Sequence, residues 1–92
     1  MSLLDAAQVL DDLANGREPD RAKLIAGALA LQTAVLREEE VDRDFLDAEA
    51  GLRTLAEGGT LDLDADGRSR AAHLEKVVRL HATRSIRKSL DT

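Results

Sequence analysis

The sequence contains no cysteine, tryptophan or tyrosine, and Phe45 is its only aromatic residue. The absence of cysteine excludes disulfides, thiol nucleophiles and cysteine-ligated zinc. The shortage of aromatic rings argues against modules that bind nucleic acid by stacking bases. The longest uncharged run, Leu24–Leu36, has 13 residues, fewer than the roughly 18–20 that span a bilayer. Because no signal peptide is apparent either, we expect a cytoplasmic protein with no membrane partner.

Alanine and leucine dominate what remains, while valine and isoleucine are few. This composition favours helix over strand. We therefore expect one domain over residues 1–92, an all-α compact bundle of three or four antiparallel helices. A chain of 92 residues buries only about 60–65% of its unfolded surface. A protein partner or a homo-oligomer is accordingly expected.

Apolar spacing predicts four helices, over about 3–14, 19–36, 41–57 and 68–90. The second begins at Pro19 and is apolar almost all round, which predicts that it forms the centre of the core. Its small residues, Gly27 among them, allow another helix to approach closely. Between Arg37 and Asp44 the apolar pattern stops, which fits either a break near 39–42 or a continuous rod with a solvated middle. We favour the break.

The third predicted helix carries apolar residues at 4-3-4-3 spacing: Val41, Phe45, Ala48, Leu52 and Leu55. Two heptads of this kind are typical of a coiled-coil-like seam. We therefore interpret the seam as part of a contact with a partner.

Charge is distributed unevenly, because residues 1–66 sum to −10 and residues 67–92 to +5. The basic residues lie on one arc of the last predicted helix, and we expect them to pair with the acidic helices within the molecule or across an oligomer. An anionic ligand or partner is the second interpretation, whereas the overall charge of −5 argues against nucleic acid. The predicted partner-interface residues are Val41, Phe45, Leu52, Arg79, Arg84, Arg87 and Lys88.

One segment matches the start of a calcium-binding loop, with Asp62, Asp64 and Asp66 followed by Gly67. His73 stands at position twelve, where such loops have a bidentate glutamate. The alternative interpretation is a polar loop in which Asp64 or Asp66 caps the last helix, and we prefer it, so no metal site is assigned.

The two histidines, His73 and His81, are eight residues apart on one predicted helix and cannot share a metal as an i, i+4 pair does. We expect them to have surface or packing roles. No nucleophile–base constellation is apparent, and the sequence predicts no catalytic residue, no cofactor and no enzyme activity.

The order of several short motifs resembles a family of small bacterial helical proteins of unknown molecular function. The motifs are Leu3-Leu4…Ala7…Leu10, Arg21…Leu24-Ile25-Ala26-Gly27-Ala28-Leu29, Leu36-Arg37-Glu38, Leu52…Gly59…Leu61-Asp62 and His73-Leu74. Members are encoded beside aminoglycoside-phosphotransferase-like kinases and acyl-CoA dehydrogenases. The resemblance implies a non-catalytic accessory subunit that stabilises or activates a hydroxyacyl-CoA kinase. Gly27 stands where the family has asparagine, and the family's terminal Asn-Pro-x-Tyr is missing. The alternative is a self-assembling helical scaffold of the phage small-terminase type.

Overall fold

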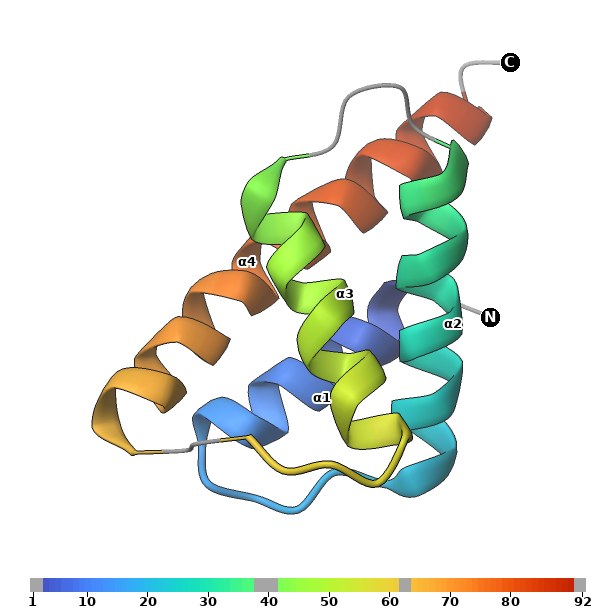
Figure 1. Ribbon diagram of the computed structural model, residues 1–92. Helices are drawn as coiled ribbons and strands as arrows, with labels where there is room; N and C mark the ends of the chain where they lie inside the picture. The colour runs from blue at the N-terminus through green and yellow to red at the C-terminus, as the bar shows by residue number, and fades with distance from the viewer. Residues whose placement is uncertain (1–2, 38–41, 62–63, 91–92) are drawn as a thin grey trace.

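The computed structural model describes residues 3–37, 42–61 and 64–90, with side chains described as far as Arg84. These segments form four helices and no strand: α1 (Leu3–Ala14), α2 (Arg21–Arg37), α3 (Arg43–Ala56) and α4 (Ala65–Leu90) (Figure 1). The all-α class predicted from composition is therefore confirmed. None of these four helices combines the length and the apolarity that crossing a membrane requires.

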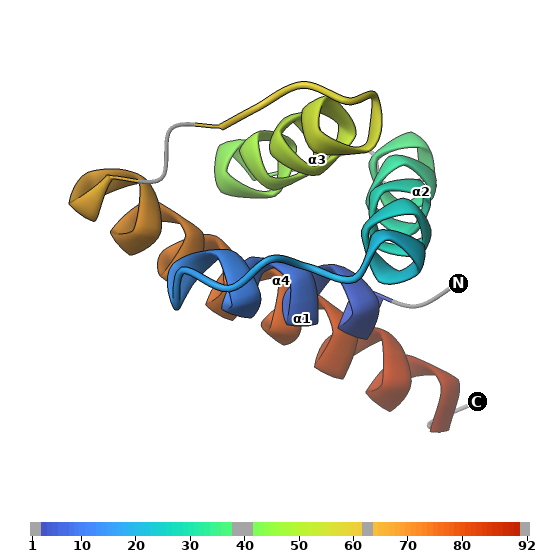
Figure 2. The same ribbon diagram turned by 90° about the horizontal axis from the view of Figure 1, so that it is seen from below.

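The four helices pack in a ring, in which α1 packs against both α4 and α2, while α3 packs against α2 and less extensively against α4. Figure 1 shows α2 and α3 running in opposite directions, and Figure 2 shows α1 and α4 together on the other side. At about 1.5 Å per residue, the 26 residues of α4 account for the long dimension of the 42 × 22 × 21 Å molecule. Both ends of α4 extend beyond α1 (Figure 2).

The second helix begins two residues later than predicted. The amide of Leu24 donates to the carbonyl oxygen of Asp20 at 2.9 Å, so Asp20 occupies the N-cap and Pro19 precedes it. The first helix ends where the sequence places its end, and Gly16 follows it with a φ of 71°. This left-handed conformation is one that glycine adopts without steric penalty.

α2 and α3 are separate helices, as the favoured interpretation of the sequence required. α2 ends at Arg37, and α3 begins after Asp42. Asp42 is the N-cap, and its carboxylate accepts from the amide of Asp44 at 3.2 Å. The break is therefore confirmed, although residues 38–41 lie outside the described segments.

The core draws its largest fully buried side chains from all four helices: Phe45, Leu31, Leu52, Val9 and Val78. α1 buries five of its 12 residues. The expectation that the second helix is buried all round is wrong, because α2 buries Leu24, Gly27, Ala30 and Leu31 but leaves much of its opposite side exposed. α1 packs more extensively against its two neighbours than α2 does against its own.

Gly27 marks the closest approach of α2 to α1. A Cβ placed on it would lie 2.8 Å from Cα and 2.9 Å from the backbone nitrogen of Ala6. Such distances are too short for any side chain, so glycine lets the two helices pack backbone against backbone. The close helix contact that the small residues of this segment predict is confirmed.

Candidate functional site

The apolar seam of the third helix is buried by the chain itself. Phe45 and Leu52 are at most 1% exposed and belong to the core. The ring of Phe45 packs against His81 of α4, with ring centroids 4.5 Å apart. These two residues are therefore unavailable to a partner of the folded chain, and the prediction that they form an interface is wrong. Heptad spacing correctly indicated a buried face but not which chain buries it.

The basic residues of α4 that were predicted to meet a partner have different environments. Arg79 forms an ion pair with Glu75 of its own helix. Arg84 is exposed and forms no ion pair with the described residues. The side chains of Arg87 and Lys88, and the whole of Val41, lie outside the described part of the chain. A partner contact at these four basic positions stays a prediction.

Pairing between the basic and acidic halves occurs where α4 faces α3. Nη2 of Arg70 donates to Oδ1 of Asp44 at 2.8 Å and to Oδ2 of Asp47 at 2.6 Å. Nε2 of His73 lies 2.9 Å from the second carboxylate oxygen of Asp44. The hydrogen bond with His73, followed by that with Arg70, lowers the pKa of Asp44 below its usual 3.8. The same two carboxylates raise the pKa of Arg70.

The segment that resembles a calcium-binding loop caps a helix. Oδ1 of Asp64 accepts from the amide of Gly67 at 2.8 Å, and its carbonyl oxygen accepts from Arg68 at 2.9 Å. Asp66 and Gly67 are already helical, because α4 begins at Ala65 rather than at Arg68 as predicted. Asp62 lies outside the described residues. The capping interpretation of Asp64 is therefore confirmed. From Ala65 onward the segment is helical, where a calcium-binding loop would be needed.

The exposed side of α2 is the first candidate site. Ile25, Leu29 and Leu36 are 42%, 46% and 79% exposed. At 3.6 residues per turn they lie within about 40° of one another, on the side of α2 opposite the buried Gly27 and Leu31. We call these three residues the outer α2 face. Its signal in the sequence is the all-round apolarity of this helix, which by itself predicts a place in the core.

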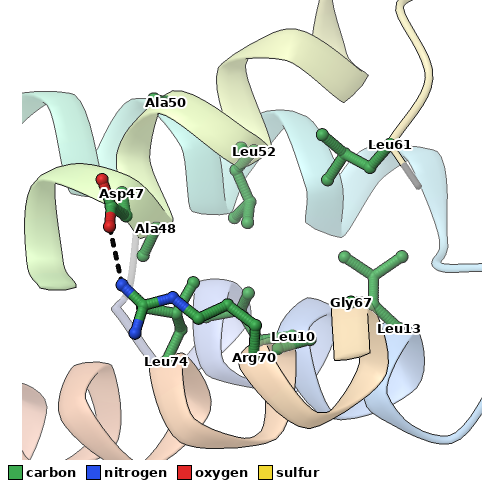
Figure 3. Close-up of a pocket in the computed structure, with 12 residues that line it drawn as sticks. Leu10, Leu13, Asp47, Ala48, Ala50, Leu52, Leu61, Gly67, Arg70 and Leu74 are labelled. Atoms are coloured by element: carbon green, nitrogen blue, oxygen red, sulfur yellow. Dashed lines mark hydrogen bonds and ion pairs between the residues drawn. The ribbon is translucent and has the colours of Figure 1, made fainter. Parts of the chain in front are cut away.

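A cavity of about 380 Å³ between α3 and α4 is the second candidate site. Its lining is mostly apolar and comes from α1, α3, α4 and the connection before α4: Leu10, Leu13, Asp47, Ala48, Ala50, Gly51, Leu52, Leu61, Gly67, Arg70, Ala71 and Leu74. Figure 3 shows the Arg70–Asp47 pair at one end and Leu61 opposite Leu13 at the other. The cavity reaches the surface, since the side chains of Arg70 and Asp47 are 45% and 47% exposed.

No pattern in the sequence indicates the cavity, because the spacing of apolar residues does not reveal how far apart two helices pack. Within the described ranges no three histidine, aspartate or glutamate side chains are grouped so as to hold a metal ion. Comparison of the chain with protein-family models, with curated proteins and with solved structures finds no significant match.

Proposed function

We propose that this protein is a non-catalytic interaction subunit that binds a second protein through the outer α2 face. The observation that carries the proposal is that α2 is apolar on two opposite sides, whereas the described part of the chain covers only one. Helices that are apolar all round are normally buried. A partner helix lying over Ile25, Leu29 and Leu36 would complete that burial.

The charges of α2 favour a different, acidic partner over a second copy of the chain. α2 contains Arg21, Lys23 and Arg37 and no acidic residue, and all three basic side chains are exposed. Two copies of α2 packed antiparallel would place Arg21 of each beside Arg37 of the other, and facing like charges oppose association. A partner helix with an apolar stripe flanked by aspartate or glutamate would instead place its negative charges beside the basic residues of α2, which favours association.

The family resemblance suggests a specific partner, an aminoglycoside-phosphotransferase-like kinase of acyl-CoA metabolism that this chain stabilises or activates. The self-assembling scaffold of the small-terminase type is the alternative. It would use the outer α2 face to bind further copies of the chain and would need no second protein.

Light scattering after co-expression with such a kinase from the same genome distinguishes the two. We expect the chain alone to be a monomer of 9.9 kDa and to form a defined complex with the kinase. Leu29→Glu should weaken that complex by roughly 30- to 1,000-fold, the range expected for an interface hot spot of about 2–4 kcal/mol. Because Leu29 is half-exposed, the variant should retain the fold.

Ser69→Glu is the matched control, since it adds the same charge at an exposed position of α4 and should leave the affinity unchanged. A ring or filament of the purified chain alone would reject the accessory subunit in favour of the scaffold. A complex that Leu29→Glu and Ser69→Glu weaken equally would remove the outer α2 face from the interface.

A further inference from the structure

The cavity between α3 and α4 is separate from the outer α2 face. None of the described residues that line it belongs to α2, and α3 and α4 pack against each other less extensively than the other neighbouring helices do. Protein interiors are usually close-packed, with few voids larger than a water molecule. A hollow of this size in a 92-residue chain therefore suggests a binding function of its own.

The walls of the cavity fit an unbranched apolar chain. Leucines from α1, α3 and α4 line it, and Figure 3 shows Leu10, Leu52 and Leu74 around the hollow. A dry cavity of about 150 Å³ holds one benzene molecule, so by proportion about 380 Å³ holds about 15 carbon atoms. Because the cavity is open at the Arg70–Asp47 end, a chain of about ten to twelve carbons fills its enclosed part.

Two carboxylates lie at or beside the polar end of the cavity, Asp47 in its lining and Asp44 next to it, and the imidazole of His73 lies against Asp44. Among the described residues that line the cavity, Arg70 is the one guanidinium, and it pairs with both Asp44 and Asp47. Asp44 uses both carboxylate oxygens, for Arg70 and for His73. Asp47 uses only Oδ2, and its Oδ1 accepts no hydrogen bond from the part of the chain that the structure describes. One carboxylate oxygen at the open end thus remains available to a donor.

We propose that this cavity binds an amphiphile with an apolar chain of about ten to twelve carbons and a cationic nitrogen head group. The chain lies among the leucines, and the ammonium group donates to Oδ1 of Asp47. An anionic head group would meet the remaining donors of Arg70, but it would lie beside the carboxylates of Asp44 and Asp47. These two carboxylates therefore favour a cation over an anion.

Isothermal titration calorimetry on the full chain, with ligands below their micelle-forming concentrations, tests the proposal. Decylammonium and decanoate have the same chain length and opposite charges. We expect decylammonium to bind at least tenfold more tightly. Equal binding, or tighter binding of decanoate, would overturn the assignment of the head group.

A substitution that fills the cavity with a side chain tests whether the ligand binds there. A Cβ on Gly51 would meet Leu61 at an ordinary 3.7 Å, so Gly51→Leu places its side chain in the hollow and should weaken decylammonium binding at least tenfold. Ser69→Leu adds the same side chain at an exposed position of α4 and is the control. Equal affinities of these two variants would show that the ligand lies elsewhere.

Two further variants, Asp47→Asn and Leu61→Ala, test the proposal even if Gly51→Leu fails to fold. Asp47→Asn should reduce the ratio of decylammonium affinity to decanoate affinity at least threefold. If Asp47 had a purely structural role, the substitution would lower both affinities equally. If Gly51→Leu does not unfold cooperatively, Leu61→Ala replaces it as the test of where the ligand lies. Removing the Leu61 side chain lengthens the cavity, so this variant should bind dodecylammonium more tightly than decylammonium. An unchanged preference in either variant counts against the proposal.

Discussion

Replacing Gly27 by alanine perturbs the contact that sets the distance between α1 and α2. In an ordinary helix interior, glycine to alanine stabilises by about 1 kcal/mol because alanine restricts the unfolded backbone. At Gly27, however, the new methyl group would lie 2.8 Å from Cα of Ala6 and 3.2 Å from its Cβ. Two of the three nearest atoms belong to the backbone of α1, so relief requires the helices to separate.

Overpacking of this kind destabilises by about 1–3 kcal/mol, and separation of α1 from α2 also loosens the contacts of their neighbours. Since the backbone atoms cannot rotate away, we take the upper part of this range and subtract the gain in helix propensity. Gly27→Ala should lower the free energy of unfolding by roughly 1–2 kcal/mol. For a domain of this size, the melting temperature should fall by about 4–16 °C.

Gly51→Ala is the matched control, because Gly51 is also helical and its Cβ would meet only a leucine methyl at 3.7 Å. It should raise the free energy of unfolding by about 0.5–1 kcal/mol. Thermal and urea unfolding followed by far-ultraviolet circular dichroism measures both variants. If Gly27→Ala is as stable as the wild type or more stable, α1 and α2 do not pack backbone against backbone, and the reasoning is refuted.

Five other substitutions, two of them controls, test the core, the cap and the ion pairs. Phe45→Ala should lower the free energy of unfolding by about 3–5 kcal/mol, whereas Leu46→Ala, at a 42% exposed neighbour, should lower it by less than about 1 kcal/mol; similar losses in urea unfolding would contradict the burial of the ring. Asp64→Ala removes the N-cap of α4 and should lower the free energy of unfolding by about 1 kcal/mol, whereas Asp66→Ala should lower it by less. A larger loss in Asp66→Ala than in Asp64→Ala would place the cap at Asp66. Because folding lowers the pKa of Asp44 from 3.8 through His73 and Arg70, its contribution to stability is complete above that value and is lost as the pH falls through the lowered pKa. Asp44→Asn should therefore flatten the acid side of a stability–pH profile, and an unchanged profile would count against the pairing.

Periodicity predicted the helices well, because it reports directly which side chains must leave water. The seam through Phe45 and Leu52 illustrates the limit of this information. Its spacing indicated a buried face, but an intramolecular core and an interface require the same pattern. Only the packing of the other helices against α3 determines that the chain buries these two residues itself.

At α2 the apolar pattern again does not tell which chain buries a residue, but here the structure leaves part of the pattern exposed. The sequence alone indicates that Leu31 and Leu29 both need burial, and it does not tell whether the chain itself or a partner covers each of them. α1 and α3 cover the side of α2 that carries Leu31 and leave Leu29 exposed. The cavity lay beyond prediction for a different reason, since Gly51 and Ala71 are ordinary helix residues and only the separation of α3 from α4 makes them the walls of a hollow.

Hydrogen–deuterium exchange on the complex of this chain with its partner tests the central claim most directly. Binding slows amide exchange in helices that it stabilises against local opening. We expect complex formation to increase protection most strongly in residues 21–37, with Leu29→Glu abolishing the increase and Ser69→Glu leaving it intact. Protection centred on α4, with none added in α2, would contradict the assignment of the outer α2 face as the binding surface.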